Sequence, residues 1–274
     1  MRDPRLRRPH VLVALAVIAL FALAALLADR LAPYDPLRVF RDAALEPPSS
    51  RFPLGTDAIG RDLLSRVLFG ARVSLTTGVV AVGIALTIGT TLGLIAGYTR
   101  GWAEVVIMRG ADVLLAFPGI LLAIAIVAVL GPGLTNVMIA VGVAAVPVYV
   151  RTVQAATLAV SRLDYILAAR AVGLPARRII FRHVLPNVTA PIIVLASVGM
   201  GAAILASAGL SYVGLGAQPP TPEWGSMLAE ARSYMREAWW LPTFPGLAIM
   251  LVVLAFNLTG DAVRDLLDPR LRRL

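Results

Sequence analysis

The residue types that usually carry covalent chemistry are scarce in this chain of 274 residues. Cysteine is absent, which removes disulfides, thiolate nucleophiles and zinc sites built on cysteine. His10 and His183 are the only histidines, too few for a histidine-rich metal cage. All 25 basic residues are arginine, so the chain lacks the lysine with which a Walker A loop binds the β- and γ-phosphates of ATP. We therefore expect no catalytic residues, no metal and no cofactor in this chain.

One serine nevertheless has the sequence context of a nucleophile. The segment Gly209-Leu-Ser211-Tyr212 is similar to the nucleophile turn of rhomboid intramembrane proteases. A serine nucleophile needs a base within hydrogen-bond distance, and no histidine follows His183 along the chain. An intramembrane serine protease is therefore the disfavoured alternative, and we expect Ser211 to pack or to face a pathway.

Ionisable residues are confined to the ends of the apolar segments. Arg109 and Asp112 are three residues apart, which places them on one helical face. We interpret them as forming a structural pair, intrahelical or interhelical, rather than a substrate site, because arginine near a segment end can extend to the membrane surface. Carriers driven by protons or sodium usually hold polar groups at mid-depth, so the pattern disfavours secondary transport.

The composition is that of a membrane protein. Apolar residues make up 58% of the chain and charged residues 15%, more apolar surface than a soluble core of this length could bury. Lipid is therefore the expected surrounding. The net charge is +9. In a membrane protein such an excess most often comes from arginines in the cytoplasmic loops, so we expect no nucleic-acid partner.

Six segments are apolar enough to cross a bilayer, which predicts an all-α membrane protein with about six transmembrane helices. The first follows basic residues, as in a signal peptide, but it is longer than a typical signal sequence and lacks a clear cleavage site, so we expect it to be retained. Gly131-Pro132-Gly133 predicts a tight turn and an antiparallel hairpin. The predicted spans are 11–28, 75–97, 105–130, 134–150, 188–215 and 240–258.

Arginine placement predicts the orientation. Basic residues precede the first span, so the N-terminus is expected in the cytoplasm, and six spans return the C-terminus to the same side. The seven arginines from Arg30 to Arg72 violate this rule locally, although acidic neighbours neutralise most of them. The predicted regions are the N-terminal tail with the first helix (1–30), an extracytoplasmic loop (31–72), a core (73–262) containing a cytoplasmic loop (161–187), and a cytoplasmic tail (263–274).

The cytoplasmic loop 161–187 is too polar to span a membrane, yet it is patterned. Asp164 is a candidate N-cap, a helix is expected to Val172, and Gly173 followed by Leu174-Pro175 predicts a stop and the start of a second short helix. That second helix is expected to carry an apolar side, formed by Ile179, Ile180, Phe181, Val184 and Leu185, and an arginine side that faces water or a partner, formed by Arg177, Arg178 and Arg182.

The spacing of Ala168, Ala169, Gly173, Leu185 and Pro186 resembles the EAA motif of ABC importer permeases, in which this loop forms the coupling helix. Leu167 stands where the family has Glu. An amphipathic helix lying on the membrane is the alternative. The resemblance implies that the ATPase-coupling residues are Asp164, Ala168, Ala169, Gly173, Arg177, Arg178, His183, Leu185 and Pro186.

Two further regions are similar to the dipeptide, oligopeptide and nickel permease family. They are Leu54-Gly-Thr-Asp57 with Gly60-Arg-Asp62, and the later run Pro222-Glu-Trp224-Gly, Asn257-Leu-Thr-Gly260-Asp261 and Asp268-Pro269-Arg270. The resemblance implies a type I importer permease in the bacterial inner membrane that carries peptides. Nickel chelates or other small molecules are the alternative cargo.

The same resemblance implies partners. They are a homologous second permease, two ATPase subunits that hold ATP and Mg²⁺, and an extracytoplasmic substrate-binding protein that touches 30–72 and 216–239. The fifth span is rich in small residues that permit close helix approach. The residues expected to line the translocation pathway are Ser207, Ser211 and Asn257.

Overall fold

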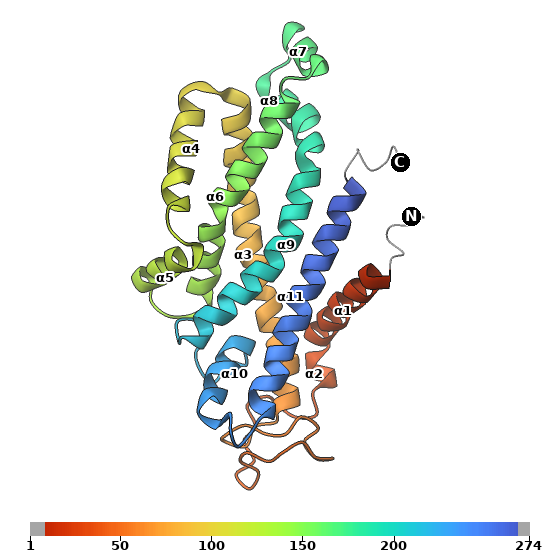
Figure 1. Cartoon of the computed structure of the whole chain (residues 1–274), viewed down its shortest axis with the longest axis vertical. Coiled ribbons are helices and arrows are strands. Elements are labelled where there is room, and N and C mark those ends of the chain that lie inside the picture. The colour runs from red at the N-terminus through yellow and green to blue at the C-terminus, as the bar shows by residue number, and fades with distance from the viewer. Residues whose placement is uncertain (1–8, 268–274) are drawn as a thin grey trace.

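The computed structural model describes residues 9–267, and these form a bundle of helices (Figure 1). The N-terminal arginines and the motif Asp268-Pro269-Arg270 lie outside the described residues. In the described part there is no β-strand, only an isolated bridge between Thr56 and Asp62. The long helices are α1 (Pro9–Leu26), α3 (Leu63–Thr99), α6 (Leu134–Val160), α9 (Leu185–Tyr212) and α11 (Trp240–Leu267). The shorter helices are α2 (Ala28–Leu31), α4 (Gly101–Leu115), α5 (Gly119–Leu130), α7 (Asp164–Ala171), α8 (Ala176–Ile179) and α10 (Trp224–Ala231).

The number of spans agrees with the sequence prediction. Five helices of the described chain are long and apolar enough to cross a membrane, and there are up to six if α4 and α5 together count as one span. The all-α fold class with about six membrane helices is thereby confirmed.

The third predicted span is broken. Residues 105–130 were expected to form one helix, but α4 and α5 meet at an angle of 93°. Pro118 occupies the N-cap position of α5. Proline lacks a backbone N–H and disfavours helical geometry in the residue before it, so the helix ends ahead of Phe117-Pro118. The turn expected after α5 is confirmed, with φ of 91° at Gly131 and 144° at Gly133.

Helices α3 and α6 pack closely along a glycine face. Gly89, Gly93 and Gly97 recur every four residues and therefore form one face of α3. A Cβ atom placed on Gly93 would lie 2.7 Å from the Cβ of Val153, and one on Gly97 would lie 2.6 Å from that of Thr157. The missing side chains let the two helices approach almost backbone to backbone.

The bundle has two distinct ends (Figure 1). The α7 end carries α7 and α8, and the α10 end is closed by α10 and the loop of residues 32–62. With 37 residues, α3 is about 55 Å long and exceeds the roughly 30 Å apolar core of a bilayer. The span expected from residue 75 belongs to a helix that begins earlier, at Leu63, behind an Asp62 cap that accepts a hydrogen bond from the Ser65 N–H. Likewise, α11 runs to Leu267, so residues 263–267 are still helical.

Candidate functional site

The loop 161–187 lies at the α7 end of the bundle, beyond the long helices it connects (Figure 1). α7 begins at Asp164, while Leu163 holds the N-cap position and no side chain caps the helix. The prediction of Asp164 as the N-cap is therefore wrong by one residue. Its carboxylate is instead in the first turn, where the positive end of the helix dipole favours an acidic group.

Gly173 forms the elbow after α7, as predicted. Its φ of +77° is a left-handed conformation that side-chain-bearing residues rarely adopt. The N–H groups of Gly173 and Leu174 donate to the carbonyl oxygens of Arg170 (3.0 Å) and Ala169 (3.1 Å), which closes the helix end. A Cβ at Gly173 would meet nothing within 4 Å, so backbone geometry alone requires glycine here.

The second short helix is not a separate unit, in contrast to the prediction. α8 has four residues and continues through a π-helical turn (Ile180–Val184) into α9. Ala176–Tyr212 therefore counts as one helix of 37 residues. Leu185 and Pro186 lie within this continuous helix and not at the end of a short one.

The inner face of the loop packs against the bundle. Ile166, Ala169, Ile179 and Val184 are buried in one apolar cluster with residues of α3, α6 and α9. The guanidinium of Arg170 lies 4.5 Å from the centroid of the Tyr98 ring at the end of α3. This cation–π contact joins α7 to α3. α7 is thus attached to the ends of the helices that it could move.

The outer face of the loop exposes apolar side chains. Leu167 is 50% exposed, Val172 76% and Phe181 60%. Phe181 was expected on the buried side, and this prediction is wrong. It lies between Arg177, Arg178 and Arg182, with which it lines a shallow depression, because the extra residue per turn of the π-helix changes which side chains face inward.

The residues predicted to couple fall into three groups. Ala169 is buried, and His183 and Leu185 are half-buried. The remaining six are exposed: Asp164, Ala168, Gly173, Arg177, Arg178 and Pro186. No group of three or more His, Cys, Asp or Glu residues within 9–267 could hold a metal. Most of the predicted coupling residues therefore lie on the surface of this subunit.

The predicted pathway residues are not solvent-exposed in this subunit. Ser207 is 2% exposed and donates to the Ile204 carbonyl (3.0 Å). Ser211 is also 2% exposed and accepts from the Ala217 N–H (3.3 Å), while Asn257 on α11 is half-buried. His183 is about 40 Å from Ser211 along the helix, too far to act as its base. The pathway role of these residues stays a prediction.

Of the two arrangements expected for the α4 charges, Asp112 forms the interhelical one. Asp112 contacts Arg151 of α6 at 2.6 Å, whereas Arg109 is exposed. The pair therefore joins two helices, and it supports the structural interpretation of Asp112.

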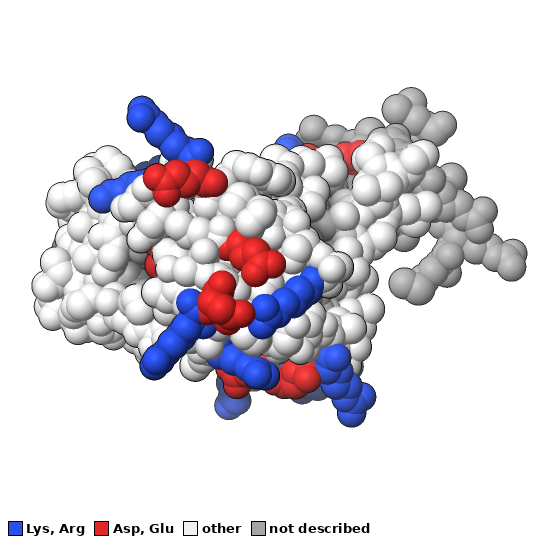
Figure 2. All heavy atoms as spheres, turned by 90° about the horizontal axis from the view of Figure 1, so that it is seen from below, with Lys and Arg blue, Asp and Glu red and all other residues white. Residues whose placement is uncertain are grey.

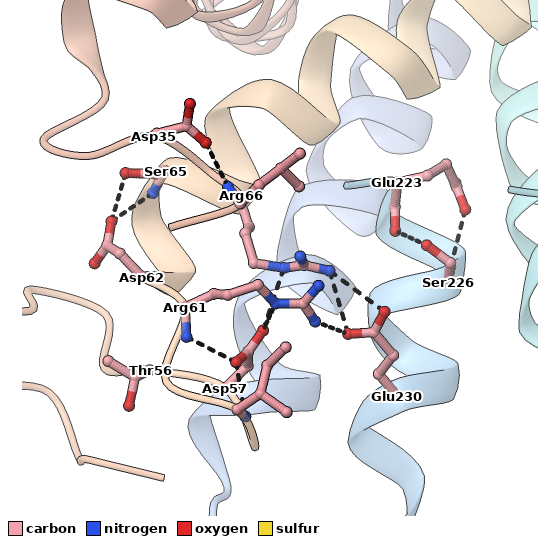
Figure 3. A network of polar contacts seen from close by, with 12 residues as sticks. Asp35, Thr56, Asp57, Arg61, Asp62, Ser65, Arg66, Glu223, Ser226 and Glu230 are labelled. Atoms are coloured by element: carbon pink, nitrogen blue, oxygen red, sulfur yellow. Dashed lines mark hydrogen bonds and ion pairs between the residues drawn. The ribbon is translucent and has the colours of Figure 1, made fainter. Parts of the chain in front are cut away.

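The α10 end holds a buried charge network that the sequence did not predict (Figure 3). The carboxylate of Glu230 on α10 accepts from Arg61 (2.6 Å) and from Arg66 (3.2 Å). Both arginines also pair with Asp57. Gly60-Arg-Asp62 belongs to a motif of the sequence, but the partner of Arg61, Glu230, is 169 residues away. No local pattern reveals a contact over this distance.

Two adjacent residues at the start of α10 fix that helix to its neighbours. Trp224 is fully buried against Gly70 of α3, and its Nε1 donates to the Val67 carbonyl (3.1 Å). The buried Glu223 carboxylate accepts from the Ser226 N–H (2.9 Å) and the Ser74 hydroxyl (3.3 Å). Burial raises the pKa of Glu223, although these hydrogen bonds oppose the shift.

Seen from the α10 end, the surface carries charges of both signs (Figure 2). Exposed residues there come from the loop 32–62 and from the segment after α10. They include Asp35, Arg38, Arg41, Asp42, Arg51, Arg232, Arg236 and Glu237. This face is suited to a partner with charges of both signs.

Comparison with known proteins identifies the family. Residues 89–273 match the model of the binding-protein-dependent transport system inner membrane component. The chain is 50% identical over 264 residues to the di/tripeptide transport system permease protein DppC of Pseudomonas aeruginosa, covering 94% of this chain and 87% of that protein. It is also 50% identical over 270 residues to the glutathione transport system permease protein GsiD of Pectobacterium atrosepticum, with coverages of 98% and 90%.

The fold is also found in a solved structure. A chain of the MetNI methionine ABC transporter in an inward facing conformation superimposes with a TM-score of 0.63 at 17% identity, covering 75% of this chain and 98% of that one. The apolar helices, the elbowed loop at the α7 end and these matches agree: the chain is a multi-pass membrane protein of the binding-protein-dependent transport system inner membrane component family, a permease of the peptide ABC importer group.

Proposed function

We propose that this chain forms half of the translocation pathway of an ATP-driven importer for small peptides in the bacterial cytoplasmic membrane. The names of its relatives support peptide cargo, since they refer to dipeptides, tripeptides and glutathione. Nickel chelates remain the second cargo class. A homologous permease would supply the other half, and a substrate-binding protein would dock at the mixed-charge α10 end.

The observation that carries the proposal is the loop surface formed by Leu167, Val172 and Phe181. These apolar side chains lie beyond the long helices and are exposed in the isolated subunit. Exposed apolar side chains that lie together mark a site of interaction with another protein. Of the three, Phe181 lines a depression together with Arg177, Arg178 and Arg182. An apolar centre with a basic rim suits a protein partner with an apolar cleft and acidic edges. Separate ATPase subunits, which would hold ATP and Mg²⁺, are that partner.

The loop is built to transmit displacement. α7 packs on α3, α6 and α9 through its buried inner face, and α8 continues directly into α9. When two ATPase subunits close on ATP, a push on α7 would tilt α6 and α9 and switch access from outside to inside. In this orientation the α7 end and both termini are cytoplasmic.

The test uses the whole transporter, with both permeases and both ATPases expressed together. Phe181→Asp and Leu167→Asp place a charge in the proposed contact, so co-purification of the ATPases should fall by about tenfold or more. Met235→Asp, at a 47% exposed apolar residue after α10, is the matched control and should keep the ATPases bound. Full ATPase recovery with both loop variants would refute the assignment.

A further inference from the structure

An open apolar groove lies between α1 and the rest of the bundle. Its volume is about 630 Å³, and four helices contribute side chains to it. At its rim, Leu26 is 74% exposed and Val79 59% exposed. Its walls and floor include Ile18, Ala22, Leu75, Met200 and Phe256. α1 and α3 are long and apolar enough to cross a membrane, so we expect the groove to open toward acyl chains.

Arg72 lines this groove and forms an ion pair with Asp29. Arg72 Nη2 contacts Asp29 Oδ2 at 2.7 Å, and Arg72 Nε donates to the Ala25 carbonyl at 2.8 Å. The side chains are 41% and 67% exposed, so both charges are accessible. Among the described residues, Nη1 of Arg72 has no hydrogen-bond partner, and it remains available to a ligand.

The depth of the pair is set by α1. The apolar run that contains this helix ends at Ala28, and Asp29 and Arg30 follow at once. Arg72 is held level with this boundary by its bond to Ala25. The hydrogen bond from Arg72 holds the pKa of Asp29 below its usual value, so the carboxylate is charged at neutral pH. A cation and an anion are therefore presented side by side where lipid headgroups lie.

The pattern of charges selects among lipid headgroups. A phosphate can bind Arg72, but a headgroup that is only anionic also places negative charge beside Asp29. A zwitterionic headgroup with a primary ammonium satisfies both residues, because the ammonium donates hydrogen bonds to the carboxylate. We propose that this groove binds one phosphatidylethanolamine molecule, with its phosphate on Arg72, its ammonium on Asp29 and an acyl chain in the groove.

The experiment is native mass spectrometry of the assembled transporter in mild detergent, titrated with phosphatidylethanolamine or with phosphatidylglycerol of the same acyl chains. The wild-type complex should bind the first about tenfold more tightly, as expected for one charge-assisted hydrogen bond. Asp29→Asn should abolish that preference, and Arg72→Gln should weaken both lipids. Asp42→Asn, which removes the exposed partner of Arg51 in the loop 32–62, is the matched control and should change neither.

A second variant keeps the test valid if the ion-pair variants fail to assemble. Ala22→Trp narrows the groove without touching either charge, so it should also reduce phosphatidylethanolamine binding. Equal affinity of the wild-type complex for the two lipids would overturn the proposal. So would efficient cross-linking of a cysteine placed at Ala22 to the second permease, since that result would show that protein fills the groove. The chain has no other cysteine to confuse the experiment.

Discussion

Gly173 shows how a single residue can control the loop that is proposed to bind the ATPases. Its φ of +77° costs a side-chain-bearing residue roughly 1–2 kcal/mol, even though space for a Cβ is available. We expect Gly173→Val to insert into the membrane normally but to distort the elbow and uncouple ATP hydrolysis from uptake. Gly173→Asn should retain coupling, because asparagine tolerates this conformation. Coupled uptake by the valine variant at the wild-type rate would show that the elbow geometry is unimportant.

Glu223 is a second residue whose environment predicts a measurable effect. Burial raises its folded-state pKa, so between the ordinary and the raised value the folded protein keeps a proton that the unfolded chain has lost. Stability from this group is full below the ordinary pKa and is lost as the pH rises through the raised value.

Glu223→Gln should therefore remove part of the pH dependence of unfolding and be more stable than the wild type at about pH 8, with little difference at about pH 4. The amide can still accept from the Ser226 N–H and preserve the cap. Thermal unfolding at both pH values measures the effect. Glu237→Gln, at an exposed residue near the same end, is the control that should show no such change.

Among the elements, α10 depends on the charge network that ties it to the loop 32–62 and α3. Glu230→Gln would leave the two buried arginines, Arg61 and Arg66, with Asp57 as their one remaining carboxylate partner, which should cost about 3 kcal/mol of stability. Asp42→Asn breaks an exposed ion pair with Arg51 and should leave the melting temperature almost unchanged. Thermal unfolding of the two variants compares them directly. Similar melting temperatures would mean that the network adds no stability.

The contact of α3 with α6 is sensitive to side-chain size. Gly93→Val puts new atoms within 2.8 Å of the Val150 carbonyl oxygen and must force the helices apart, at a cost of about 2 kcal/mol or more. Gly83→Ala, on the same helix where nothing lies within 4 Å, should instead stabilise α3 by up to about 1 kcal/mol. Unfolding measured in the same detergent separates the two effects. A valine variant as stable as the wild type would show that the helices are not in close contact.

On the scale of the whole molecule, the proposed orientation can be tested with two single-cysteine variants. Arg51→Cys lies at the α10 end and Val172→Cys at the α7 end, and both side chains are exposed. In intact cells, a maleimide that cannot cross membranes should label position 51 and leave position 172 unlabelled until the membrane is permeabilised. The opposite labelling pattern would reverse the orientation and remove the basis for placing ATPases at α7.

The sequence by itself determined the fold class, the number of spans, the glycine elbow and the family. Each of these follows from a local sequence signal. The signals are runs of about 20 apolar residues, glycine where φ is positive, and motifs at short spacing. Helix boundaries were less predictable, because the span expected to begin at residue 75 belongs to a helix that begins at Leu63 and includes Arg66 and Arg72. Their charges are matched by Glu230 and Asp29, which are far away in the chain.

Only the tertiary structure decided which surfaces are free and which groups meet. Ala169 and Ala168 are adjacent in one motif, yet one is buried and the other exposed, since that depends on how α7 packs on α3 and α6. The register shift of the π-helical turn moved Phe181 to the outside, and the network at Glu230 joins residues more than 160 positions apart. Such contacts follow from the packing of whole helices, and they cannot be predicted from a sequence pattern that repeats every few residues.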